Sequence, residues 1–187
     1  MRIRKANCDR QKLLFSIALI ALTVLTALTA LTVTIFAKLF MLNFQYSSLI
    51  NAPVERVWQF HERADILNLL TPPWQPVTIV RREGGLGVGA ISEFKLSLAG
   101  IPVPWIATHI ECVPNRLFVD CQTEGPMESW IHRHEFSLEG DRTRLTDAIA
   151  YEIPGGFLSE MLLGWWVEAR LHDMFRYRHQ VTKTYCE

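Results

Sequence analysis

The residues best suited to chemistry lie between Phe118 and Asp147, where polar and aromatic side chains recur at every second position. The polar members of this pattern are Asp120, Gln122, His132, His134 and Asp147. Residues two apart in a strand point to the same face of a sheet, so adjacent strands would gather these groups on one face. A protein core accepts imidazole and carboxylate groups only when they are paired. The pattern is therefore typical of a paired polar network or of a lined cavity.

Turn sequences predict how these polar residues face one another. Turns are indicated at Gly140-Asp141, at Gly125–Met127 and at Pro114-Asn115. The resulting register places three pairs opposite each other: His134 with Asp147, His132 with Asp120, and His109 with Asp120. Opposed side chains lie close enough for a carboxylate to hold an imidazole. The sequence thus predicts one polar cluster inside an aromatic wall.

Four interpretations of this cluster stay open. It can be a satisfied buried network that fixes the sheet register, or it can bind the polar head of an apolar ligand. His132 and His134, with His109 and a carboxylate, could ligate zinc, although the spacing alone assigns no metal site. A histidine held by an aspartate can also act as a general base. The candidates for catalysis are His132, His134, Asp120 and Asp147.

The elements expected around the cluster define an α+β domain over residues 41–187. A first strand covers 42–50, and Asn51 is expected to cap a short helix that has Pro53 in its first turn. A second short helix spans about 64–70. Six strands follow at about 77–82, 90–98, 103–113, 117–124, 128–139 and 142–153. A long helix over 157–182 ends the chain, and a sheet curled around it would enclose a space.

The last helix carries an apolar stripe that is expected to face the sheet. Its members are Leu163, Val167, Leu171, Met174 and Val181. The first half of this helix, which includes Trp165, has almost no polar face. Loops could cover its second side, or that side could contact a ligand or a membrane surface. Farther along, Arg178 and His179 are expected to face water.

The N-terminal segment has the pattern of a membrane anchor. Residues 1–12 form a basic tail, and residues 13–40 are anchor-like, with no charge between Leu13 and Ala37. The positive-inside rule then predicts a single-pass protein with a cytoplasmic N-terminus. Translation from Met41 would instead give the domain without an anchor, in the cytoplasm.

The charge balance argues against nucleic acid as a partner. After residue 40 the chain has thirteen basic and eighteen acidic residues. Binding to nucleic acid depends on neutralising phosphates, which a net acidic domain does poorly. The four cysteines show no metal-ligand spacing and support no disulfide assignment.

From Leu42 to Val181 the sequence resembles the START-like, or SRPBCC, superfamily, which includes the birch-pollen allergen and polyketide cyclases. The matching motifs are Ala52-Pro53-x-x-x-Val57-Trp58-x-Phe60-His61, Leu70-Thr71-Pro72-Pro73, Phe118-x-Asp120-x-Gln122-x-x-Gly125-Pro126, Trp130-x-His132-x-His134-x-Phe136, Asp147-x-x-x-Tyr151-x-x-Pro154 and Met174-Phe175-x-Tyr177-Arg178. The resemblance implies a helix-grip fold: a seven-stranded antiparallel sheet around a long C-terminal helix, with a deep hydrophobic cavity. It implies ligands such as lipids, sterols, quinones or polyketides, but no established catalytic residues.

The expected function is therefore to bind or carry a hydrophobic small molecule, without a cofactor. The alternatives are a cyclase or dehydratase that uses a His/Asp pair, and a membrane-tethered interaction domain with a vestigial cavity. The residues expected to line the cavity are Phe44, Trp58, Phe94, Trp105, His109, Phe118, Asp120, Gln122, Trp130, His132, His134, Phe136, Asp147, Tyr151 and Trp165.

Overall fold

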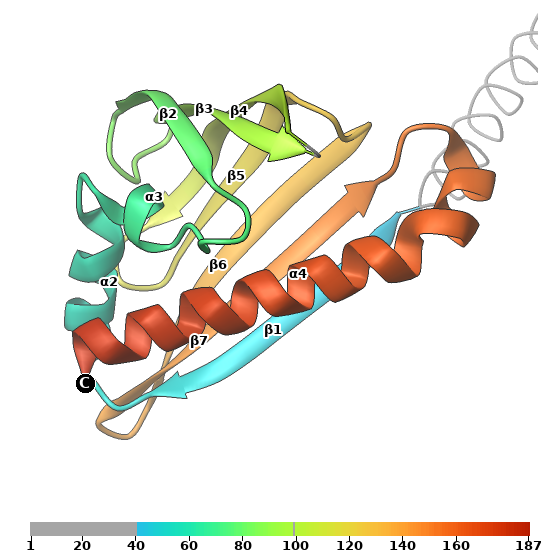
Figure 1. The fold of residues 1–187 in the computed structure, drawn as a ribbon. Helices are drawn as coiled ribbons and strands as arrows, with labels where there is room; N and C mark the ends of the chain where they lie inside the picture. The colour runs from blue at the N-terminus through green and yellow to red at the C-terminus, as the bar shows by residue number, and fades with distance from the viewer. Residues whose placement is uncertain (1–40, 99) are drawn as a thin grey trace, which may run out of the picture. The chain divides into compact units, whose positions relative to one another are not determined.

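A seven-stranded antiparallel sheet is the scaffold of this protein (Figure 1). The computed structural model describes residues 41–98 and 100–187. The strands are β1 (Leu42–Ile50), β2 (Val77–Glu83), β3 (Ile91–Leu98), β4 (Ile101–Val113), β5 (Leu117–Glu124), β6 (Ser129–Glu139) and β7 (Arg142–Glu152). Their order is β1-β7-β6-β5-β4-β3-β2, so β2 to β7 follow one another as a meander and β1 pairs with β7.

Three helices complete the described chain: α2 (Val54–Glu62), α3 (Ile66–Leu69) and α4 (Gly156–Cys186). Helix α4 runs over one face of the sheet and contacts β1 and β7, and its C-terminal end meets α2 (Figure 1). The chain enters α4 through Gly155, whose φ of 98° is a conformation that glycine adopts without strain. The arrangement confirms the predicted α+β helix-grip fold with two short helices after the first strand.

Two helix boundaries differ from the expectation. Pro53, not Asn51, is the N-cap of α2, and no side chain caps this helix. The backbone N–H of Asn51 instead donates to Glu187 Oε1 (2.9 Å), so this residue ties the C-terminus to the domain. Helix α3 is also shorter than predicted, because Asp65 and Leu70 already lie outside the helical backbone range.

The predicted anchor lies outside the described residues. None of the helices that the structure describes has the length and apolar character to cross a bilayer.

The predicted register is confirmed. His134 lies opposite Asp147, and both His132 and His109 lie opposite Asp120. One detail differs, because the pairing of β5 with β6 stops at Cys121 and Ile131.

Two apolar clusters fill the interior on either side of the polar residues. The first joins α2 to the sheet, with Trp58, Phe118, Phe136 and Leu145 among its members. The second lies under α4 and contains Phe44, Trp105, Trp130, Tyr151, Leu171 and Phe175. The polar residues of β5 to β7 lie where the clusters meet, since Phe118 stacks on His134 and Phe175 contacts His132.

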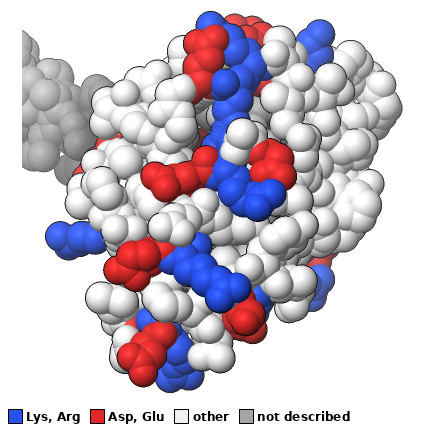
Figure 2. Space-filling model, turned by 90° about the vertical axis from the view of Figure 1, so that its left-hand side faces the viewer, with Lys and Arg blue, Asp and Glu red and all other residues white. Residues whose placement is uncertain are grey.

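Charged residues are interspersed on the surface. Figure 2 shows basic and acidic side chains side by side on the described part of one face. Many of these charges are paired on the surface, as in the ion pairs Arg63–Asp65 and Arg133–Glu111. The face in Figure 2 therefore offers no extended basic surface of the kind that binds phosphate backbones.

Candidate functional site: a buried histidine–aspartate cluster

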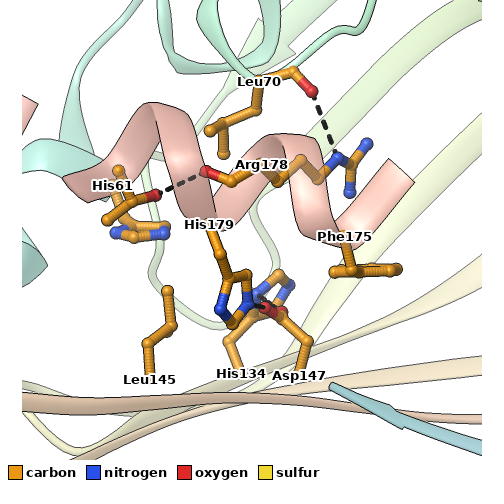
Figure 3. A pocket seen from close by; sticks show the side chains of 9 residues that line it. His61, Leu70, His134, Leu145, Asp147, Phe175, Arg178 and His179 are labelled. Atoms are coloured by element: carbon orange, nitrogen blue, oxygen red, sulfur yellow. Dashed lines mark hydrogen bonds and ion pairs between the residues drawn. The ribbon is translucent and has the colours of Figure 1, made fainter. Parts of the chain in front are cut away.

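Asp147 is the centre of the candidate site. Its carboxylate is buried and contacts three imidazoles from two elements, and Figure 3 shows two of them, His134 and His179. Oδ1 accepts from His132 Nε2 (2.8 Å) and from His134 Nδ1 (2.6 Å), both on β6. Oδ2 accepts from His179 Nε2 (2.6 Å) on α4. A single carboxylate on β7 thus connects the sheet to the helix that crosses it.

A second carboxylate, Asp120 on β5, faces the other edges of the two β6 histidines. Its Oδ2 lies 3.3 Å from His134 Nε2 and 3.8 Å from His132 Nδ1. The two imidazoles therefore lie between two carboxylates, with their ring centroids 3.7 Å apart. We call Asp120, His132, His134, Asp147 and His179 the His/Asp cluster.

His179 belongs to the cluster although the sequence analysis expected it to face water. It lies four residues after Phe175 and eight after Leu171, and all three are buried. That spacing of four places them on one face of α4, and it is the signal that could have identified His179. Its Nδ1 lies 2.7 Å from Ser48 Oγ on β1, so its ring is fixed at both nitrogens.

His109 lies beside the cluster rather than inside it. Its ring stacks on Phe118, with centroids 5.3 Å apart. Its Nδ1 is 2.9 Å from the carbonyl oxygen of Leu86, in the glycine-rich turn between β2 and β3, and must donate there because a carbonyl only accepts. The register is therefore as predicted, but the polar contact is to the backbone.

The cluster distributes charge unevenly among its histidines. Burial alone would raise the pKa of Asp147, but the charge of His134 and three imidazole hydrogen bonds hold it well below its usual range. Burial would lower the pKa of His134, yet the two carboxylates raise it to about 9. Burial and the neighbouring His134 lower the pKa of His132, which its hydrogen bond to Asp147 only partly offsets. At neutral pH His134 is charged and His132 is neutral.

A small cavity adjoins the cluster between the sheet and α4 (Figure 3). Its volume is about 20 Å³, enough for one water molecule. Its lining residues are His61, Leu70, His134, Leu145, Asp147, Phe175, Arg178, His179 and Thr182. Arg178, expected to face water, points inward instead: its Nε donates to Leu70 O (3.2 Å) and its guanidinium lies 5.2 Å from the Phe175 ring centroid.

The sequence matches the model of a known protein family. Residues 50–176 match the family model described as polyketide cyclase / dehydrase and lipid transport. The chain belongs to this family. The match confirms the resemblance to SRPBCC proteins, and it covers every member of the His/Asp cluster except His179. No curated protein sequence matches the chain.

Solved structures share the fold of this polyketide cyclase/dehydrase family member. TTHA0849 from Thermus thermophilus is 19% identical, with a TM-score of 0.62 over 78% of this chain and 97% of that one. Ginseng major latex-like protein 151 from Panax ginseng is 11% identical, with a TM-score of 0.60 over 79% and 99% of the two chains. The di-domain ARO/CYC StfQ from the steffimycin biosynthetic pathway is 13% identical, with a TM-score of 0.59 over 79% and 51%. These similarities establish the fold alone.

Aromatic side chains pack against one another under α4, where a deep cavity was expected. Trp105 and Trp130 pack edge to face at 5.2 Å, and Trp130 packs on Tyr151 at 5.9 Å. Phe44 packs on Phe175 at 5.5 Å. These predicted cavity residues are buried as expected, but they fill the space under α4 rather than line it. Among the predicted lining residues only His134 and Asp147 border the cavity.

Three residues have roles other than those predicted. Trp165 is 69% exposed and donates from Nε1 to Leu162 O, so it lies outside the interior. Gln122 braces the turn after β5, because its amide bonds both the carbonyl (2.8 Å) and the N–H (3.3 Å) of Met127. Leu163 is 48% exposed and does not belong to the buried stripe of α4.

His61 on α2 predicts an acid-sensitive stability. Burial lowers its pKa to about 4, while its Nδ1 donates to Val57 O (2.8 Å). Above pH 6.5, which is the pKa of histidine in the unfolded chain, His61 is neutral in both the folded and the unfolded state, so its burial does not make stability depend on pH. Below that pH, the unfolded chain binds the proton first, so stability falls until the folded pKa is reached, by about 3 kcal/mol in total.

The test is a series of urea unfolding experiments between pH 7 and pH 4 on the wild type and His61→Leu. Between pH 7 and pH 4 the free energy of unfolding of the wild type should fall by about 3 kcal/mol more than that of the variant. His172→Leu, at an exposed position of α4, is the control and should follow the wild type. Parallel pH profiles for the wild type and His61→Leu would refute the buried neutral state of His61.

Proposed function

We propose that the protein binds a hydrophobic small molecule between the sheet and α4, with the polar head of the ligand at the His/Asp cluster. The observation that carries the proposal is the cavity between the sheet and α4. Polar side chains, among them His134, Asp147, Arg178 and His179, line it together with the apolar Leu70, Leu145 and Phe175. Ligand sites combine apolar walls with a few placed polar groups in this way. The family description, which includes lipid transport, supports the same function.

The ligand must widen a cavity that holds one water molecule. The connection between α3 and β2 is the segment best placed to move. It is attached to α4 by the Arg178–Leu70 hydrogen bond and by an edge-to-face contact of Trp74 with Tyr177 (5.4 Å). Outside that contact lies an open groove of about 240 Å³, lined by Trp74, Arg170, Asp173 and Arg176. In the proposal this groove is the mouth, and displacement of Trp74 connects it to the cavity.

The polar groups favour a ligand with a neutral oxygen head, such as a carbonyl or a hydroxyl. The Arg178 guanidinium has five N–H donors, one of which bonds Leu70 O. The two carboxylates of the cluster would repel a strongly anionic head placed beside them. A carbonyl oxygen accepts from Arg178 without this penalty, which agrees with quinones or polyketide-like molecules more than with free fatty acids.

A cavity-filling substitution tests this site. Leu145, 1% exposed, lines the cavity, whereas Leu138 on β6 is 67% exposed. The full chain is incubated with a bacterial lipid extract and analysed by native mass spectrometry. The wild type and Leu138→Phe should each retain one apolar molecule per chain. Leu145→Phe should retain about tenfold less, because its larger ring occupies space that the ligand must enter. A wild type that retains nothing, or equal retention by Leu145→Phe, would contradict the proposal.

A cyclase or dehydratase mechanism is less well supported. A general base must present a nitrogen to its substrate. In His132, Nε2 bonds Asp147 and Nδ1 faces Asp120. His134 has the same two neighbours and carries a proton at neutral pH because its pKa is raised to about 9. His132 is neutral, but its Nδ1 faces Asp120 and its ring does not line the cavity, so neither imidazole is placed to remove a proton from a molecule bound there.

A further inference from the structure

Three ligand-type atoms of the His/Asp cluster converge on one point. Asp120, His132 and His134 each offer one such atom, and the three atoms lie within 4.8 Å of one another. Asp120 Oδ2 is 3.3 Å from His134 Nε2 and 3.8 Å from His132 Nδ1. Tetrahedral zinc with bonds of about 2.0–2.1 Å separates its ligand atoms by roughly 3.3 Å. Small side-chain adjustments, together with release of the Nε2 proton of His134 to solvent, would therefore bring all three atoms to bonding distance of one ion.

The opposite edges of both imidazoles have the partner that metal-binding histidines need. His132 Nε2 and His134 Nδ1 both bond Asp147 Oδ1, at 2.8 and 2.6 Å. A histidine that ligates a metal usually donates its other N–H to a carboxylate, which fixes the ring and the tautomer. Asp147 is itself held by His179, and His179 by Ser48. The structure thus contains a ligand set and the residues that orient it.

The local charge and shielding also suit a cation. Two carboxylates flank the two imidazoles in a buried region, and the side chains of Asp120, His132 and His134 are only 13%, 6% and 13% exposed. A divalent ion would offset both negative charges. Phe118 stacks on His134 (4.0 Å) and Trp130 lies edge-on to His132 (6.4 Å), which shields the site from water.

We propose that Asp120, His132 and His134 form a binding site for a divalent transition-metal ion of the zinc type, with Asp147 as the positioning residue for both histidines. Two imidazole nitrogens and one carboxylate oxygen select zinc, cobalt or ferrous iron over magnesium and calcium, which prefer oxygen ligands. Three protein ligands leave a position for water or for an oxygen of a bound molecule. The site stands on its own geometry and does not depend on the proposed apolar ligand.

Calorimetric titration with zinc tests the site in the full chain after treatment with a chelator. The wild type should bind one zinc ion per chain, confirmed by elemental analysis, and should not bind magnesium under the same conditions. Asp120→Asn and His134→Gln should bind at least about 100-fold more weakly, and Asp147→Asn about 10- to 100-fold more weakly. His172→Gln, at an exposed position of α4, should bind as the wild type does. Circular dichroism shows whether each variant is folded.

Cobalt titration of the wild type provides a readout that needs no variant. Visible bands of a four- or five-coordinate ion, without a thiolate-to-cobalt charge-transfer band, are expected for nitrogen and oxygen ligands. A thiolate band would assign the ion to cysteines, such as the free Cys112, Cys121 or Cys186, and would overturn the site. Absence of zinc binding by the wild type, or unchanged affinity in folded Asp120→Asn and His134→Gln, would overturn it as well.

Discussion

Replacement of Asp147 by alanine is expected to lower the free energy of unfolding by about 3–5 kcal/mol. The substitution removes the carboxylate that accepts from His132, His134 and His179, and it leaves three buried imidazoles without that partner. The largest part of the cost arises at His134, because its positive charge would remain buried with only the longer contact to Asp120 (3.3 Å). Urea unfolding at pH 7, after treatment with a chelator, measures the loss.

Asp141 supplies the matched control for this substitution. It is an exposed aspartate in the turn between β6 and β7, so Asp141→Ala should change the free energy of unfolding by less than about 0.5 kcal/mol. If Asp147→Ala cost no more than Asp141→Ala, the carboxylate would not be what holds the three imidazoles together.

Replacement of Phe175 by alanine is expected to cost a similar amount, about 3–5 kcal/mol. Phe175 is fully buried at the centre of α4. Its ring packs on Phe44 (5.5 Å), contacts His132 edge-on (5.2 Å) and lies under the Arg178 guanidinium (5.2 Å). Truncation opens a void beside the cluster and removes the apolar contact between helix and sheet. Thermal or urea unfolding of the full chain measures this loss.

The same helix provides the control. Phe157 at the start of α4 is 63% exposed, so Phe157→Ala should lie within about 0.5 kcal/mol of the wild type. A cost for Phe175→Ala below 1 kcal/mol would mean that the helix does not close over the sheet as described.

The register of the sheet could be predicted because two local signals agreed. Turn residues such as Gly140-Asp141 fixed the pairing, and the two-residue period of the strands fixed the face. Together they placed His134 opposite Asp147 and His132 opposite Asp120, as the structure confirms. The fold class and the order of elements followed from the same pattern.

The third imidazole at Asp147 could not be inferred from strand pairing. His179 comes from α4, which is linked to the sheet by no register. Its neighbours in sequence, such as Asp173, Arg176 and Arg178, suggested a face directed to water. The buried spacing from Leu171 and Phe175 was the competing signal, and tertiary packing followed that one.

The size of the cavity also could not be predicted from the sequence. Periodicity identifies which side chains point inward, but it does not measure how much of the interior they fill. Trp105, Trp130 and Tyr151 point inward as predicted and close the space by packing on one another. In the first half of α4, Trp165 and its apolar neighbours are exposed, although their apolar character would equally suit a buried helix.

Nuclear magnetic resonance of the histidine rings tests most directly whether the His/Asp cluster receives the ligand's polar head. The full chain is loaded with the molecule retained from the lipid extract, and the ring nitrogen signals are compared with those of the unloaded protein. The signals of His134 and His179 should move, because both rings border the cavity, whereas that of the exposed His172 should not. A bound molecule that leaves His134 and His179 unchanged would contradict the proposed function.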